Sequence, residues 1–102
     1  MAKYQVKAES MLESIMPIFL KSVSEDLLKI KAAVENQDFA TVQALGHKIK
    51  GSAGGYGFDV LGAMARDLEA SAKAKQLEAA HMHLMAMIEF MNDFEIIYQD
   101  EE

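Results

Sequence analysis

The sequence predicts an all-α fold, an antiparallel four-helix bundle with an additional short N-terminal helix. Strand-forming residues are few beside Ala, Met, Leu, Glu and Lys, which favours helices. A single proline and six glycines leave little for turns. Apolar residues recur at steps of three and four, the spacing of one helix face. Because 102 residues is the size of one domain, residues 1–102 are expected to form a single helical bundle.

The first two predicted helices are separated by a proline. A short helix is expected over about residues 5–15, as a lid over one end of the bundle. Pro17 fits the first turn of a second helix, where its missing N–H costs nothing, and it disfavours helical geometry at Met16. One apolar stripe then follows the second helix, made of Phe19, Val23, Leu27, Ile30 and Val34. The polar run at residues 36–38 interrupts it.

A third helix is expected to begin at Phe39, because Asp38 is a good N-cap. Its buried face is predicted to carry Val42, Leu45, Ile49, Ala53 and Tyr56. Gly57 is a natural left-handed stop, and Asp59 is expected to cap a fourth helix. The apolar positions of that fourth helix are Val60, Met64 and Leu68.

The last helix is predicted from a single long stripe of Leu77, Ala80, Leu84, Met87, Met91, Phe94 and Tyr98. The break before it, at residues 71–76, is inferred mainly from length, because an unbroken helix from Asp59 to Tyr98 is too long for so small a domain.

Composition excludes several classes of function. The net charge of -6 and the acidic pI disfavour a nucleic-acid binder, because neutralising phosphates needs surplus Lys and Arg. Cysteine is absent, which excludes disulfides and thiolate metal sites. No apolar run approaches the length of a membrane span, and the first residues lack the apolar stretch of a signal peptide, so a cytoplasmic location is expected.

The glycines are concentrated around one histidine. All six lie between Gly46 and Gly62, and those inside the third helix each cost about 1 kcal/mol relative to alanine. Helical phase places His47 about 170° from the centre of the buried stripe, with Gly51 and Gly54 on the same exposed face. We therefore expect an outward imidazole with open space beside it, flanked by Gln43 and Lys50.

Few reactions suit an isolated, exposed imidazole. General acid–base catalysis needs a pocket, and metal binding needs further ligands. Nucleophilic catalysis remains, because neutral imidazole is a competent nucleophile near pH 7 and can hold a group covalently. The nearby charges of Lys48 and Lys50 suit a phosphoryl group. The chain has no Walker-type G-x-x-x-x-G-K-[ST] loop, so the phosphoryl group is expected to come from another protein, and no kinase or ATPase activity of its own is expected.

The segment from Gly46 to Asp59 resembles the signature of histidine-containing phosphotransfer (HPt) domains of bacterial two-component phosphorelays. The family pattern is H-x-x-K-G-[SA], then a glycine ten residues after the histidine, then spaced leucines ending in Leu-Glu. In this sequence the matching positions are His47, Lys50, Gly51, Ser52, Gly57, Leu61 and Leu68-Glu69. Ala65 occupies a position where many members have cysteine, and we interpret this difference as a change in packing.

The resemblance implies a phosphoryl carrier. His47 would accept a phosphoryl group at Nε2 from the aspartyl-phosphate of a receiver domain in a hybrid sensor kinase and pass it to the receiver aspartate of a response regulator. The chain would need no cofactor, since the receiver would contribute the Mg²⁺. Lys50 would help to position the phosphate, with Lys48 and Gln43 as weaker candidates and Ser52 either functional or structural. Gly51 and Gly54 would give the partner access. Lys48, the residue after His47, favours a carrier over a kinase helix, where an acidic residue is usual.

Two other interpretations stay open. A binding-only adaptor that blocks a receiver or kinase domain would need the glycine-cleared face but not a nucleophilic His47. A ligand-binding bundle is disfavoured because His81 and His83, two residues apart, do not share a helix face, and the methionine stripe beside them is typical of a core. The acidic tail is expected to be a solvated end. A monomer is expected, since a bundle closed within 102 residues needs no partner chain.

Overall fold

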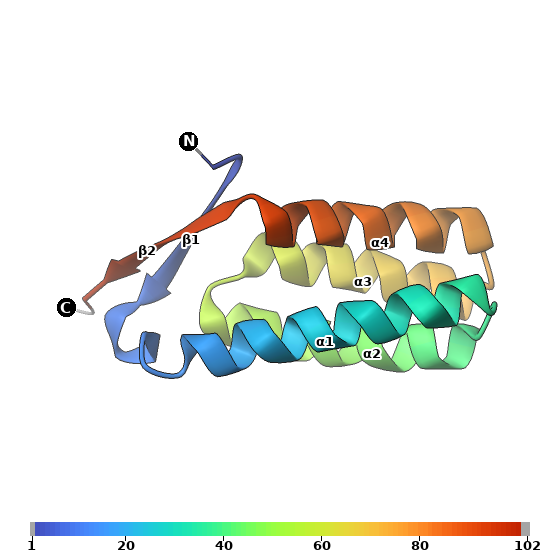
Figure 1. Ribbon diagram of the computed structural model, residues 1–102, viewed down its shortest axis with the longest axis horizontal. Helices are drawn as coiled ribbons and strands as arrows, with labels where there is room; N and C mark the ends of the chain where they lie inside the picture. Colours follow the sequence, from blue (N-terminus) through green and yellow to red (C-terminus); the bar gives the residue numbers. More distant parts are fainter. Residues whose placement is uncertain (1, 101–102) are drawn as a thin grey trace.

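The computed structural model describes residues 2–100 and shows four long helices packed side by side in an antiparallel bundle (Figure 1). These are α1 (Met16–Glu35), α2 (Phe39–Ala53), α3 (Asp59–Lys73) and α4 (Leu77–Asn92). Each helix packs on its neighbours in the order α1, α2, α3, α4, and α4 closes the bundle on α1. The predicted four-helix architecture is thus confirmed, and the α2–α3 side of the bundle lies opposite the α1–α4 side. None of these helices is long and apolar enough to cross a membrane.

The predicted start of α2 at Phe39 is confirmed, but two other boundaries differ from the prediction. α1 begins at Met16, which Pro17 was expected to keep out of helical geometry, and α2 ends at Ala53 rather than reaching Tyr56. Pro17 lies in the first turn of α1, and the whole predicted stripe of that helix is buried. Gln37 reverses the chain with a positive φ of 54°. Asp38 then caps α2, because its carboxylate accepts a hydrogen bond from the Thr41 backbone N–H at 3.2 Å. The bond satisfies one of the free N–H groups of the first turn.

The N-terminal helix predicted for residues 5–15 is wrong. The segment forms strand β1 (Tyr4–Glu9) and a short 3₁₀ turn (Ser10–Leu12). The last helix also ends at Asn92, and strand β2 (Phe94–Gln99) replaces the predicted extension to Tyr98. The two strands pair in parallel, from Tyr4 opposite Phe94 to Glu9 opposite Gln99. Both sequences alternate between inward and outward residues, the period-two pattern that a half-buried strand requires.

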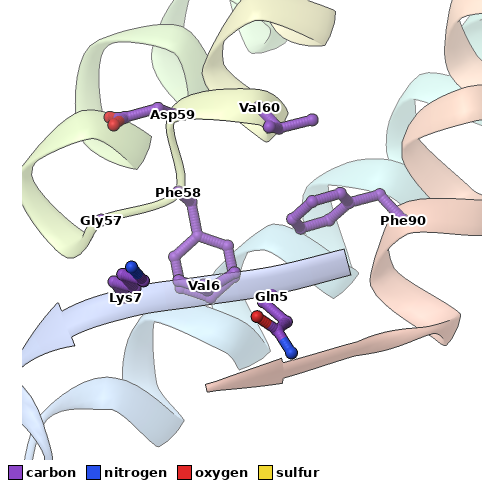
Figure 2. Close-up of a pocket in the computed structure, with 8 residues that line it drawn as sticks. All are labelled: Gln5, Val6, Lys7, Gly57, Phe58, Asp59, Val60 and Phe90. Atoms are coloured by element: carbon purple, nitrogen blue, oxygen red, sulfur yellow. The ribbon is translucent and has the colours of Figure 1, made fainter. Parts of the chain in front are cut away.

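The corner between α2 and α3 is held against β1. A 3₁₀ turn (Gly54–Tyr56) ends α2, and Gly57 follows with φ of 86°, which confirms the predicted left-handed stop. A Cβ atom at Gly57 would collide with the carbonyl oxygen of Lys7 in β1. Figure 2 shows this approach, with Phe58 directed from the corner toward β1. The corner therefore requires glycine for two reasons, its backbone conformation and the strand beside it.

Aromatic rings fill the end of the bundle beneath this corner. Phe58 is fully buried, and its ring centroid lies 6.0 Å from that of Phe90 and 5.4 Å from that of Phe94. Tyr56 stacks on Phe19 of α1 at 4.2 Å. The strands, the corner and the helices thus share one core, which fixes the end of α2.

The start of α3 differs slightly from the prediction. Phe58 occupies the N-cap position and Asp59 is the first helical residue, with no side-chain capping bond. The buried stripe of α3 consists of Leu61, Ala65, Leu68 and Ala72, so Val60, predicted as an apolar position of this helix, is exposed and Leu61 is buried in its place. The break predicted for residues 71–76 is confirmed, since α3 ends at Lys73 and Lys75 has a positive φ of 55°.

Candidate functional site

His47 projects from the outer face of α2, as the helix phase predicts. The buried face of α2 is set by Val42, Ile49 and Ala53, each at most 1% exposed. His47 lies on the other side, and its side chain is 67% exposed. The prediction of an outward imidazole on a helix surface is therefore confirmed.

A glutamate from the neighbouring helix contacts the imidazole. The Nδ1 atom of His47 lies 2.8 Å from Oε2 of Glu69, which is on α3. An ionised carboxylate can only accept, so Nδ1 carries the hydrogen and donates it to Glu69. In the neutral ring this arrangement places the lone pair on Nε2. The contact thus selects one tautomer and directs the nucleophilic nitrogen to the other side of the ring.

The same glutamate also holds Lys50. The Nζ atom of Lys50 lies 2.7 Å from Oε1 of Glu69, so the two carboxylate oxygens serve two different partners. The hydrogen bond from Lys50 is the main cause that lowers the pKa of Glu69, and the bond from His47 adds to it against partial desolvation. His47, Lys50 and Glu69 form one connected group, which we call the His–Glu–Lys cluster.

Gly46 explains how Glu69 comes within reach. A Cβ atom at Gly46 would lie 3.3 Å from the backbone nitrogen of Glu69 and 3.4 Å from the carbonyl oxygen of Ala65. The absence of a side chain therefore lets α2 and α3 approach closely at this level. Gly46 lies inside α2, away from the end of the helix, and the element that its backbone approaches is α3.

Gly51 and Gly54 have a different environment. Both are exposed, and a Cβ atom at either would have no neighbour within 4 Å. No contact within the described residues accounts for their lack of a side chain, although each lowers helix propensity. Their effect is a flat, open surface along the α2 face that carries His47.

The other residues predicted for the site lie elsewhere or act locally. Lys48 turns toward α1, where its Nζ lies 2.9 Å from Oδ2 of the buried Asp26. The Ser52 hydroxyl donates to the backbone carbonyl of Lys48 at 3.1 Å, a contact within the helix. Gln43 is half-buried one turn before His47. The structure thus brings Lys50 together with His47 and directs Lys48 away from it.

Glu69 is the residue that sequence reasoning did not assign to the site. The motif places Glu69 in its closing Leu-Glu pair, but it does not indicate which residue the carboxylate contacts. The two remaining histidines, His81 and His83, lie on α4. Within residues 2–100, no group of three His, Asp or Glu side chains is arranged to hold a metal ion.

Comparison with known proteins gives one match. The family model described as "Hpt domain" matches residues 14–95, which include all four helices and the first two residues of β2 but not β1. Neither the comparison with curated proteins nor that with solved structures found a match.

Proposed function

The chain belongs to the Hpt domain family, whose members interact with receiver domains in two-component signalling, and from this premise we propose that His47 is its phosphoryl acceptor. In this proposal His47 takes the phosphoryl group from the aspartyl-phosphate of a hybrid kinase's receiver and passes it to the receiver aspartate of a response regulator. The observation that carries the proposal is the contact between His47 and Glu69 on an imidazole that is largely exposed.

The forward step is a nucleophilic displacement. The Nε2 lone pair of His47 attacks the phosphorus atom, and an N–P bond forms while the bond from phosphorus to the aspartate oxygen breaks. The leaving carboxylate keeps the electron pair of that bond. Because the ring keeps its proton on Nδ1, it becomes cationic, and the Glu69 carboxylate at 2.8 Å stabilises this charge. Glu69 thus favours the transition state in two ways. It keeps the proton on Nδ1, and its negative charge stabilises the positive charge that develops on the ring.

Lys50 supplies positive charge beside the ring. Its ammonium group lies 2.7 Å from Oε1 of Glu69, the carboxylate whose other oxygen contacts Nδ1 of His47. We assign it the role of positioning the incoming phosphoryl oxygens. The open surface at Gly51 and Gly54 supports the approach of the receiver, because no side chain stands between its aspartyl-phosphate and the ring.

Transfer to the second receiver is the reverse of the first step. A receiver aspartate attacks the phosphorus atom, the N–P bond breaks, and the electron pair returns to Nε2. Glu69 then again holds a neutral ring with its proton on Nδ1. No other residue of this chain needs to gain or lose a proton in either direction, which suits an exposed imidazole on a helix surface.

The test is transfer of radiolabel from a panel of phosphorylated receiver domains. The wild-type chain is expected to gain an acid-labile, base-stable label, and His47→Gln is expected to abolish it while the helical circular dichroism signal stays unchanged. His81→Gln, which replaces an exposed histidine of α4, serves as the matched control and is expected to keep the label. A label that survives in His47→Gln contradicts the proposal. If receivers bind the wild-type chain without labelling it, the chain is a binding-only adaptor.

A further inference from the structure

The α1–α4 side of the bundle carries a continuous apolar surface. Leu28 is 71% exposed, Met82 61% and Met85 47%, and Ile88 and Met91 lie half-buried between α1 and α4. A groove of about 350 Å³ lies between Leu28 of α1 and Ile88 and Met91 of α4. A shallower depression, which also includes Ile88, extends over Met82 and Met85. We call these five residues the apolar face.

This surface differs from apolar residues scattered singly over a protein. Single exposed residues need no explanation, whereas a connected apolar patch with polar residues around it is typical of an interaction site. Three of the five side chains are methionines, which adapt their shape to a packed partner. Leu84, Met87 and Phe90 fill the inner face of α4, and Ile88 and Met91 pack against the edge of that core, which leaves Leu28, Met82 and Met85 without a role in it.

The apolar face is separate from the His–Glu–Lys cluster. The cluster bridges α2 and α3, and these helices form the side of the bundle opposite α1 and α4. A partner on the apolar face would therefore leave His47 accessible to a receiver.

We propose that the apolar face binds a second copy of this chain through a two-fold axis. Such an interface joins a surface to itself, so it must be self-complementary in shape and in charge. The exposed Leu28 of each copy would enter the groove beside Ile88 of the other. The ridge and the groove that this exchange needs are both present on the one face.

Two charged residues at the face, Lys31 and Asp93, fit the same symmetry, while Glu89 of the same depression is paired with Lys3 of its own chain. Helices α1 and α4 run in opposite directions (Figure 1). Lys31 lines the groove about 4.5 Å beyond Leu28 along α1. Asp93, the residue directly after α4, lines the adjoining depression about 7.5 Å beyond Ile88, so the two depart toward opposite ends of the bundle. A two-fold axis between Leu28 and Ile88 brings Lys31 of each copy close to Asp93 of the other. Because these opposite charges pair across the two-fold axis, they favour a second copy of this chain over a different protein.

The inference revises the expectation of a monomer. That expectation followed from the closure of the core within 102 residues, and it did not consider the outer surface of the helices. The dimer goes beyond the proposed phosphotransfer and does not depend on it. It would carry two His47 sites on opposite outer sides of the assembly.

Sedimentation velocity of the purified chain over a series of concentrations tests the proposal. The weight-average mass is expected to rise from that of the 11.3 kDa monomer toward twice that value. Leu28→Glu is expected to weaken the dimer on the order of tenfold or more, because it places a charge in the centre of the interface. The variant should fold normally, since Leu28 is exposed in the single chain.

Ile18→Glu is the matched control, because Ile18 is also on α1 and is also 71% exposed but lies outside the apolar face. It is expected to dimerise like the wild type. Lys31→Glu and Asp93→Lys should each weaken the dimer, and the double variant should restore it. A wild-type chain that stays monomeric at every concentration overturns the proposal, as does a dimer that Leu28→Glu leaves intact. Neither result depends on whether His47 is phosphorylated.

Discussion

The Nδ1 atom of His47 lies 2.8 Å from Oε2 of Glu69, so an exposed imidazole on one helix is oriented by a carboxylate on the next. The second oxygen of the same carboxylate holds Lys50 at 2.7 Å. Outside this cluster the ring is open to solvent, with the glycine positions Gly51 and Gly54 on its face.

Glu69→Ala is expected to slow phosphoryl transfer to His47 by about 10- to 100-fold, the range that is typical when a metal-bound histidine loses the partner that orients its ring. Glu69→Gln should have a smaller effect, because its amide oxygen can still accept from Nδ1 but carries no charge. The measurement is the rate of label transfer from a phosphorylated receiver at saturating receiver concentration. Equal rates in the wild type and in both variants would show that Glu69 has no part in the reaction.

The stability that Glu69 contributes is expected to depend on pH. Its pKa is lowered in the folded chain, first by the hydrogen bond from Lys50 and then by that from His47. A carboxyl group with a lowered pKa contributes stability that is complete above its ordinary pKa and is lost as the pH falls through the lowered one. Urea unfolding should therefore show wild type more stable than Glu69→Gln at neutral pH, with a difference that shrinks in acid. Glu25→Gln, at an exposed position of α1, measures the general effect of losing one carboxylate. A difference that stays constant with pH contradicts the ion-pair origin.

Gly51→Leu should separate access from stability. A Cβ atom at this position would have no neighbour within 4 Å, and leucine favours a helix by up to about 1 kcal/mol over glycine. The variant is therefore expected to unfold at an equal or higher urea concentration and yet to accept the phosphoryl group slowly. Transfer at the wild-type rate would show that the receiver does not approach across this face.

Lys48 and Lys50 are expected to differ in function although they are two residues apart. Lys48→Met leaves the Asp26 carboxylate, 4% exposed, without its ion-pair partner, which should cost about 1–3 kcal/mol of unfolding free energy. Lys50→Met should reduce the transfer rate more than Lys48→Met does, because Lys50 belongs to the His–Glu–Lys cluster. Denaturant unfolding and label transfer on both variants make the comparison. If Lys48→Met has the slower transfer of the two, the phosphate-positioning role belongs to Lys48.

The helices could be predicted because their signals are local. The stripe of α1, the Asp38 cap and the Gly57 stop each depend on residues within a few positions, and the structure confirms all three. The strands could not be predicted in the same way, since Gln5 and Glu95 pair across 90 positions of sequence. Their alternating pattern was present, but each segment also satisfied part of a helical spacing. Only the pairing of the two segments decides between the two structures.

In the candidate site, too, the features within one helix could be predicted, and the contacts between helices could not. Helix phase within α2 was sufficient to expose His47 and to place Gly51 and Gly54 on its face. Glu69 could not be assigned, because its contact depends on how closely α3 approaches α2 at Gly46. The ion pair of Lys48 with Asp26 could not be predicted either, because Asp26 is on another helix, α1. Contacts between helices require the packed structure, and these contacts decide which neighbours of His47 touch it.

The most direct test of the central claim is nuclear magnetic resonance of the chain labelled with ¹⁵N in its histidine rings, before and after incubation with a phosphorylated receiver. We expect the His47 ring to hold its proton on Nδ1 beforehand and to carry the phosphoryl group on Nε2 afterwards, while the signals of His81 and His83 do not change. A phosphoryl group on Nδ1 of His47, or on any other residue, would contradict the account.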